Sequence, residues 1–541
     1  MLLETIAYRE SLSPEEFTNE FLATNRPVLI GPGLTTNWKA RQAWVQTHCL
    51  TYDFDPGVLW DRIKPLYPQY GPEYQFFQAV LEEIVRGTKL TETPREKTPR
   101  REFRFAGPRW SYWKERFGNA QVSVSDCWPE LEKDSTEGEN GHHYPQEQAC
   151  GQAMTMLEFL ALYPNTHPGE TPDVKSGDAG TLWVVLIARL EHCAKLPGEA
   201  LDQTVLQELF GEFWHHDHNL RFKCKGGPLW SPTVAKRRYY LKDWHMTQQF
   251  PDEGAYDIPG QFADDWINQF WDHWDAVQDD YRFVYMGGHG TWTPFHTDVF
   301  KSYSWSSNIC GIKHWVLYPP TEEDSYTDSL KNTVFDVYHY PTARFPNFSQ
   351  AKVYHVYQMP GQTLYVPSGW AHQVENIGDT VSINHNWGNA FNVSTLYNEL
   401  ELQLDNVEHA IQDVQDMDDW SGHCQLLLKV NHGINLSDFF HYLDFKTRDI
   451  VTRLLAMPRF DSSRKQLLEY IPETCCQHAK CTHSPNPTDY SSTPDYLYRS
   501  LQPVQYVLRA MVQNPRYAQT TWHSKAQMWV VLLERITKLQ L

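Results

Sequence analysis

The stretch Thr293-Pro294-Phe295-His296-Thr297-Asp298 decides the fold and the chemistry expected of this 541-residue chain. On a β-strand, residues i and i+2 point to the same face, so a strand here would direct the His296 imidazole and the Asp298 carboxylate toward one interior point. Both groups are common metal ligands, and two ligands from one strand leave a third to be supplied from elsewhere. The pattern therefore predicts a metal site inside a β-structure.

The candidate for the third ligand is His372, which lies 76 residues after His296. A strand entered through Gly361 and left through the turn at Pro367 would bring His372 back across a closed barrel. Two histidines and one carboxylate on a single face leave three coordination positions open, which is the ligand set of non-haem Fe(II) oxygenases. We therefore expect His296, Asp298 and His372 to bind iron.

Two other groups of metal-ligand residue types are weaker candidates. An isolated His-x-Asp pair means little in a chain with 24 histidines, and a second pair, His215 and Asp217, lies in a stretch without strand alternation. We interpret that pair as a polar surface cluster. The other group has zinc-like ligand types, but its spacing matches neither C-x2-C nor H-x3-H, so an exposed loop is favoured over a zinc site. Its members are Cys476, His478, Cys481 and His483.

From Tyr281 onward, short aromatic and β-branched runs alternate with turns. Many short strands at close spacing, with no helical pattern between them, indicate a sandwich or barrel rather than a parallel α/β sheet. The core is therefore predicted to be all-β. The strands expected are 281–286, 312–318, 353–359, 362–366 and 380–387.

The N-terminal part is expected to mix helices, strands and loop insertions. A helix start is indicated by Ser13, which precedes Pro14 and two glutamates. The apolar run 27–30 is typical of a buried strand. Polar stretches rich in proline, glycine or charge are interpreted as loop insertions, because they supply no face to bury. These stretches are 88–101, 133–148 and 164–180, the last of which begins a longer insertion-rich region, 164–235, of unassigned role.

The C-terminal part switches to a helical period. Apolar residues recur there at steps of three and four, on one helix face: Leu396, Leu400, Leu404, Val407, Ile411 and Val414. The tail to residue 541 is predicted to be mostly helical and broken by the polar stretch 474–495, and no pattern assigns a function to 446–541. We expect an α+β protein with an N-terminal region (1–235) that partly contributes to the core, a β-core (236–395) and a helical region (396–541).

The composition excludes several classes of function. Lys and Arg number 47 against 67 Asp and Glu, which gives a net charge of −20. Such a chain is not drawn to phosphate backbones or anionic lipid, so a basic protein is a better expected partner than nucleic acid or a membrane. The start lacks a secretory pattern, apolar runs fall short of the roughly 20 residues of a membrane helix, and the ten cysteines are scattered. We expect reduced thiols and a cytoplasmic, alternatively nuclear, location.

Three blocks around the metal pattern occur in order with appropriate gaps. They are Trp292 to Asp298, Gly311-x-Lys313-x-Trp315 with the following Tyr318-Pro319-Pro320, and Val366-Pro367-Ser368-Gly369-Trp370-x-His372-x-Val374-x-Asn376. Together they resemble a JmjC domain, a family of iron- and 2-oxoglutarate-dependent oxygenases built on a double-stranded β-helix. The resemblance implies this jelly-roll, or cupin-like, fold for the core.

Further blocks at 240–245, 281–285, 304–311 and 382–392 are similar to the JmjC-domain-containing protein four subfamily. The similarity continues into 433–441. It covers residues 236 to about 445 well, and 15–50 and 120–162 more weakly.

The resemblance implies roles for single residues. The three predicted ligands would hold Fe(II), and Lys313 would pair with the distal carboxylate of 2-oxoglutarate, which needs a buried cation in a narrow barrel. The alternative for Lys313 is an outward-facing lysine on a strand. Thr293 and Tyr240 match positions that hydrogen-bond the same carboxylate. Ser306 and Asn384 match positions at which some members carry asparagine and threonine, so their individual contacts stay open.

The resemblance also implies an activity. A protein hydroxylase of this kind would consume 2-oxoglutarate and O2 and hydroxylate a side-chain carbon of a lysine in subunit one of the eukaryotic translation termination (release) factor. One alternative is a histone or protein N-methyl-lysine demethylase, although the sequence shows no clustered Cys/His reader module. Another is a non-catalytic binding scaffold. The presence of all three predicted ligands and of Lys313 argues against it. The sequence does not indicate the oligomeric state.

Overall fold

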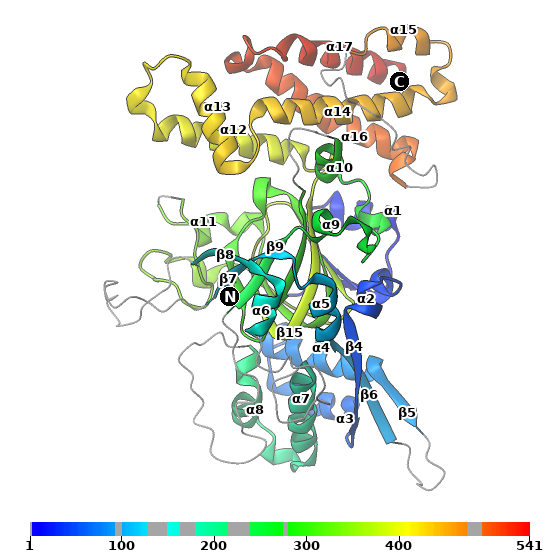
Figure 1. The fold of residues 1–541 in the computed structure, drawn as a ribbon, viewed down its shortest axis with the longest axis vertical. Helices are drawn as coiled ribbons and strands as arrows, with labels where there is room; N and C mark the ends of the chain where they lie inside the picture. Colours follow the sequence, from blue (N-terminus) through cyan, green and yellow to red (C-terminus); the bar gives the residue numbers. More distant parts are fainter. Residues whose placement is uncertain are drawn as a thin grey trace.

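The computed structural model describes residues 3–91, 100–127, 149–162, 179–214, 239–273, 280–329, 331–472 and 490–540. Its β-core occupies the middle of the molecule, with a layer of helices from the C-terminal part at one end (Figure 1). Three features of the sequence analysis lie outside the described residues. They are the pair His215/Asp217, the group Cys476, His478, Cys481 and His483, and the predicted insertion 133–148.

Two long, bent strands organise the core. Strands β12 (Tyr303–Tyr318) and β15 (Ala371–Trp387) pair antiparallel from Tyr303 opposite Trp387 to Tyr318 opposite Ala371, with shifts of register between Asn308 and Ile312. Both bend at a glycine with positive φ, +73° at Gly311 and +76° at Gly378. A Cβ at Gly311 would lie 2.6 Å from the backbone oxygen of Asp379, so the close approach of the two strands requires glycine there.

The bends let β12 and β15 belong to two four-stranded layers. On one side of the bends the order is β14 (Thr363–Val366), β12, β15, β10 (Arg282–Gly287), and on the other it is β13 (Val353–Gln358), β12, β15, β11 (Trp292–His296). Eight strand segments in two layers are the double-stranded β-helix that the sequence led us to expect. The all-β core and the α+β class with jelly-roll core are confirmed.

Segments that precede β10 in the chain extend both layers. The predicted helix is α1 (Pro14–Phe17), whose Ser13 and Glu16 form a reciprocal capping box. It leads to β3 (Val28–Ile30), the buried strand that the apolar run 27–30 predicted, and β3 pairs with β14. The other added strands are β1 (Leu3–Glu4) on β13, β2 (Ala7–Arg9) on β3, and the series β9 (Tyr239–Trp244), β7 (Gln121–Asp126) and β8 (Ala149–Thr155) on β10.

The prediction of a loop insertion at 88–101 is wrong for both ends of that stretch, which are β-strands. Strands β5 (Thr88–Thr91) and β6 (Arg100–Pro108) form a hairpin that pairs with β4 (Val45–Tyr52) in a separate three-stranded sheet. Phe103 of β6 packs edge-on against Trp183 of helix α7 (Ala179–Lys195). The charged residues around Phe103 concealed this alternation. The insertion-rich region 164–235 contains two helices, α7 and α8 (Gln203–Phe210), which the sequence analysis did not predict.

The helical C-terminal part is confirmed in its main features. Helix α12 (Val393–Ala410) buries Leu396, Leu400, Leu404 and Val407, but the helix ends at Ala410, so the predicted stripe does not continue to the exposed Val414. The helices that share its core are α10 (Trp266–His273), α13 (Trp420–His432), α14 (Leu436–Leu455), α15 (Arg464–Leu468), α16 (Pro494–Gln513) and α17 (His523–Gln540).

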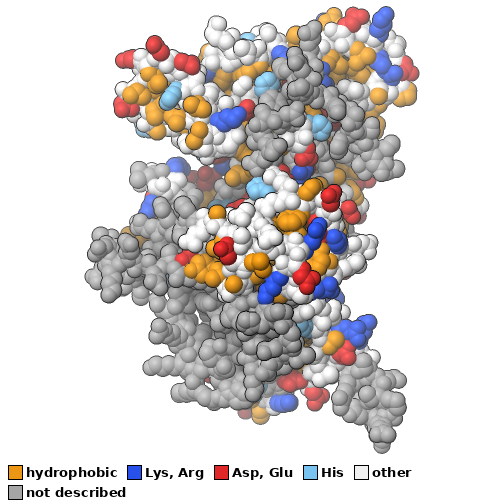
Figure 2. Space-filling view, in the orientation of Figure 1, with side chains coloured by type: hydrophobic (Ala, Val, Ile, Leu, Met, Phe, Trp, Pro, Cys, Tyr) orange, Lys and Arg blue, Asp and Glu red, His pale blue; other side chains and the backbone are white. Residues whose placement is uncertain are grey.

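Shorter or peripheral helices complete the described fold. They are α2 (Ala40–Ala43), α3 (Pro56–Ile63), α4 (Pro72–Gly87), α5 (Trp110–Phe117), α6 (Met156–Ala161), α9 (Met246–Gln249) and α11 (Glu323–Tyr326). Within the described residues, every helix is too short or too polar to cross a lipid bilayer. On the face drawn in Figure 2, the described basic side chains are interspersed with acidic ones. The division at 235 and 395 into three parts stays a prediction.

Candidate metal and co-substrate site

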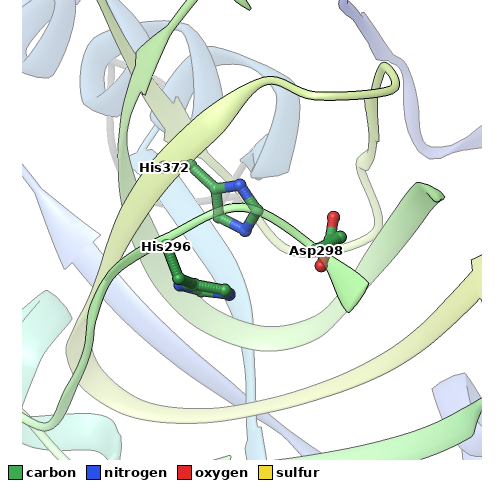
Figure 3. A group of neighbouring side chains, drawn as sticks. All are labelled: His296, Asp298 and His372. Atoms are coloured by element: carbon green, nitrogen blue, oxygen red, sulfur yellow. The ribbon is translucent and has the colours of Figure 1, made fainter. Parts of the chain in front are cut away.

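The three predicted metal ligands come together in the core. His296 is the last residue of β11 and pairs across the ladder with His372, the second residue of β15. One potential ligand atom from each of His296, Asp298 and His372 lies within 4.8 Å of the other two. Figure 3 shows the two imidazoles and the carboxylate converging on one space. His372 is buried and the other two are partly exposed, so the site is open on one side.

The position of Asp298 differs from the sequence expectation in one detail. The strand β11 ends at His296, so Asp298 is not a strand residue. Its backbone is nevertheless extended, with φ −60° and ψ 150°, before the chain enters the one-turn helix η8 (Val299–Lys301). The local extended geometry therefore keeps the i, i+2 relation with His296 that the motif requires.

Backbone hydrogen bonds orient both predicted histidine ligands. The Nδ1 atom of His296 lies 2.7 Å from the backbone oxygen of Pro294, and that of His372 lies 3.1 Å from the oxygen of Trp370. A carbonyl oxygen only accepts, so each Nδ1 carries the proton and each Nε2 keeps its lone pair for a metal. Burial, followed by the neighbouring His372, lowers the pKa of His296 to about 4, so this imidazole is neutral at neutral pH.

The predicted carboxylate ligand, Asp298, is oriented by a residue of a third strand. The Ser304 hydroxyl of β12 donates to Oδ2 of Asp298 at 2.7 Å, which leaves the other carboxylate oxygen for a metal. Partners of this kind hold a ligand in position and tune its basicity. Two imidazoles and one carboxylate, with an open side, are a donor set that fits Fe(II) and leaves room for other ligands.

A buried cation lies on the same face of the core. Lys313 of β12 is 2% exposed and stands four residues before Leu317, which pairs with His372. That spacing corresponds to about 13 Å along the strand. The Lys313 ammonium donates to the Tyr240 hydroxyl at 3.3 Å and lies 5.9 Å from the centre of the Tyr240 ring. No carboxylate of the described residues forms an ion pair with Lys313, and burial lowers its pKa to about 7.

The other predicted co-substrate residues have different surroundings. The hydroxyl of Thr293, on β11, is buried and has no hydrogen-bond partner among the described residues. Ser306 and Asn384 lie opposite each other on β12 and β15, and the Ser306 hydroxyl donates to the Asn384 side-chain oxygen at 3.1 Å. The structure thus brings Lys313 and Tyr240 together, leaves Thr293 with an unused polar atom, and pairs Ser306 with Asn384.

Two residues at this site carried no predicted role. The Tyr285 ring centre lies 5.8 Å from the Lys313 ammonium, and the Tyr285 hydroxyl donates to the Asp243 carboxylate at 2.5 Å. Burial raises the pKa of Tyr285 well above its ordinary value, and the charges of Asp243 and Asp298 raise it further. Asp243 is exposed and has a left-handed backbone, φ +54°, at a bulge of β9. The alternation of β10 could have indicated Tyr285, whereas a bulge gives no such signal.

Comparisons with known proteins agree with this geometry. Residues 283–387 match the family model described as "JmjC domain, hydroxylase". The chain is 43% identical over 238 residues to "2-oxoglutarate and iron-dependent oxygenase JMJD4" of Danio rerio, which covers 42% of this chain and 55% of the relative. It is 44% identical over 227 residues to "Arginine-specific demethylase JMJ20" of Arabidopsis thaliana, covering 39% and 49%. The chain thus spans about half the length of these two relatives.

A longer and weaker similarity reaches beyond the core. "JmjC domain-containing protein 1" of Schizosaccharomyces pombe is 27% identical over 433 residues, which cover 76% of this chain and 75% of the relative. The family match lies on the strands that carry His296, Lys313 and His372. Residues 283–387, which form most of the double-stranded β-helix, therefore match the JmjC domain family.

Proposed function

We propose that this protein is an Fe(II)- and 2-oxoglutarate-dependent protein hydroxylase. The observation that supports it most is the convergence of His296, Asp298 and His372, whose ligand atoms lie within 4.8 Å, on the face that also carries the buried Lys313. The names of relatives such as the Danio rerio oxygenase agree with this chemistry. A purely scaffolding role would give no reason to keep an unpaired buried lysine, which is costly without a bound anion.

In this proposal each group has a defined task. His296 and His372 would bind iron through Nε2, and Asp298 would bind it through the oxygen that Ser304 leaves unused. Iron with 2-oxoglutarate supplies oxidation of a substrate C–H bond by O2, with succinate and CO2 as the other products. The chain itself holds the reactants in place, because this chemistry is selective only when the target carbon is positioned.

Lys313 would hold the distal carboxylate of 2-oxoglutarate. A carboxylate beside the ammonium favours the protonated form, so binding would raise the pKa of Lys313 from about 7. Tyr240, whose hydroxyl already accepts from Lys313, and Thr293, whose hydroxyl is unpartnered among the described residues, would add hydrogen bonds to the same carboxylate. Ser306 and Asn384 are proposed to line the same interior with their paired side chains.

We propose a lysine side chain of a protein as the substrate, with subunit one of the eukaryotic release factor as the first candidate. The exposed Asp243 carboxylate supports a cationic substrate, because Tyr285 connects it to the vicinity of both Lys313 and Asp298. The net charge of −20 favours a basic partner. A translation factor as substrate would place the activity in the cytoplasm.

The second candidate is removal of an N-methyl group from a protein side chain. It is favoured by the similarity to a relative named as an arginine-specific demethylase. The same oxidation at an N-methyl carbon would release formaldehyde, whereas hydroxylation at a ring or chain carbon leaves the added oxygen on the substrate. The two reactions therefore differ in a product that can be measured directly.

The test combines both products in one experiment. Purified protein is incubated with Fe(II), 2-oxoglutarate and either release factor subunit one or methylated histone peptides, and substrates are mapped by mass spectrometry while formaldehyde is assayed. We expect a mass gain of one oxygen on a lysine of the release factor and none with His296→Ala, while His409→Ala, on the exposed face of α12, keeps the wild-type yield. Formaldehyde without oxygen addition would favour demethylation, and neither product would refute both candidates.

A further inference from the structure

The turn that follows the metal ligand Asp298 has an unusual backbone. Phe300 (φ +56°) and Lys301 (φ +50°) are consecutive, and both are in the left-handed region. Residues with a Cβ rarely adopt this conformation, and it persists only where surrounding contacts enforce it. The turn η8 must therefore be held by contacts outside itself, and those contacts lead away from the metal site.

The Phe300 ring is held by the C-terminal helices. It packs against their hydrophobic core and lines a small apolar cavity together with Leu396 and Leu400 of α12 and Phe439 of α14. On its other side, the ring centre of Tyr281 lies 6.3 Å away. An apolar side chain two residues from a metal ligand is thus inserted into a different structural region.

Lys301 makes a second connection to the same helix. Its ammonium lies 3.4 Å from the Glu399 carboxylate of α12 and 3.6 Å from that of Glu323 of α11. The Glu399 side chain is only 15% exposed, against 48% for Glu323, so the contact with α12 is the better shielded from water. The backbone oxygen of Lys301 accepts a hydrogen bond from Ser368, in the turn that leads to His372.

The same turn is joined to the metal ligand itself. The backbone N–H of Lys301 donates to the backbone oxygen of Asp298 at 3.0 Å. The next residue, Ser302, accepts from the Asn386 side-chain amide at 3.2 Å, which ties the turn to β15. Through η8, then, both Asp298 and the turn before His372 are connected to one face of α12.

We propose that η8 is a strap by which helix α12 positions the carboxylate of Asp298 for the metal. Phe300, Lys301 and Glu399 are positioning residues, because each acts on the metal through Asp298 rather than by touching it. The C-terminal helices thereby help to set the geometry of the metal site, although none of their residues touches the metal. This inference rests on the proposed metal site, and it assigns to that site a control by residues that lie far away in the sequence.

The test uses Co(II) as a probe that binds such sites and reports its coordination geometry by visible absorption. Glu399→Gln leaves η8 unchanged in sequence and removes only the charge on α12. Its matched control is Glu408→Gln on the same helix, whose ion pair with Arg516 stays within the C-terminal region. Mutation of a group that contacts a metal ligand directly lowers metal affinity by about 10–100-fold. Because Glu399 acts on Asp298 only through Lys301, we expect about three- to ten-fold weaker Co(II) binding and an altered spectrum for Glu399→Gln.

Two more variants separate positioning from general damage. Lys301→Met should weaken Co(II) binding like Glu399→Gln, the double variant should be no weaker than either single one, and Lys301→Arg should restore affinity. Phe300→Gly suits the left-handed backbone but lacks the ring, so it should also lose affinity. Melting temperatures of metal-free Glu399→Gln, Lys301→Met and Lys301→Arg should match that of Glu408→Gln, whereas that of Phe300→Gly should be lower because its ring packs against the helical core.

The outcomes distinguish the two levels of the proposal. If the wild type does not bind Co(II), the metal site itself is wrong. If the wild type binds Co(II) and Glu399→Gln, Lys301→Met and Phe300→Gly all bind it with unchanged affinity and spectrum, the strap is refuted while the metal site stands.

Discussion

Lys313→Met should stabilise the metal-free protein while it removes co-substrate binding. Lys313 is fully buried, and burial lowers its pKa from 10.5 to about 7. One pKa unit corresponds to about 1.4 kcal/mol. At pH 7, Lys313 therefore lowers the free energy of unfolding by roughly 4 kcal/mol relative to a lysine whose pKa does not change on folding. Methionine fills a similar volume without charge, although it loses the hydrogen bond to Tyr240. We therefore expect the free energy of unfolding to rise by about 2–4 kcal/mol at pH 7.

The sign of the pH dependence follows from the direction of this shift. Between pH 7 and pH 10.5 the unfolded state binds more protons at this position than the folded state, so the contribution of Lys313 to stability rises with pH and is least below pH 7. The advantage of Lys313→Met over the wild type should accordingly shrink above pH 7. The matched control is Lys331→Met, a lysine whose side chain is 72% exposed, which should leave stability unchanged.

Binding of 2-oxoglutarate should depend on pH in the opposite sense. If only protonated Lys313 receives the carboxylate, the apparent dissociation constant rises about ten-fold between pH 6 and pH 8 and by a further factor of about ten per pH unit above that. His296, with a pKa of about 4, stays neutral over this range. Calorimetric titration of Mn(II)-loaded protein measures the constant, and thermal unfolding of metal-free protein measures stability. A flat affinity between pH 6 and pH 8, together with a lower melting temperature for Lys313→Met, would refute the reasoning.

Three other expectations concern single contacts. Ser304→Ala removes the hydroxyl that orients Asp298 and should weaken Mn(II) binding by about ten-fold in a fluorescence or calorimetric titration, with little change in melting temperature. Asp243→Asn should raise KM for a lysine-bearing peptide about ten-fold while kcat changes less, and an unchanged KM would exclude Asp243 from substrate binding. Gly311→Ala places a Cβ 2.5 Å from Thr380 at a positive φ, so a loss of more than about 2 kcal/mol is expected by denaturant or thermal unfolding.

The sequence predicted the strands of the core but not their continuity. Runs 312–318 and 380–387 show strand composition, whereas the structure continues both strands through Gly311 and Gly378. Glycine within a strand usually indicates an end or a bulge, because it adds no packing and loosens the backbone. Only the pairing of the two strands, which are distant in sequence, makes a bent strand favourable at these glycines.

The site was predicted where chemistry and spacing coincide on one element. His296 and Asp298 are two residues apart, and that local relation survives although the strand ends between them. Asp243 and Tyr285 escaped prediction because their contact joins β9 to β10 at a bulge, which depends on the register of two separate strands. In the same way, nothing local connects Lys301 with Glu399, 98 residues later in the chain.

Metal stoichiometry tests the central claim most directly. The protein and its variants are loaded with Fe(II) without oxygen, freed of excess metal and measured by elemental mass spectrometry. The convergence of His296, Asp298 and His372 predicts one iron per chain in the wild type and in the control His409→Ala, and almost none in His372→Ala. An iron content that His372→Ala leaves unchanged, or a wild type that retains no iron, would contradict the account.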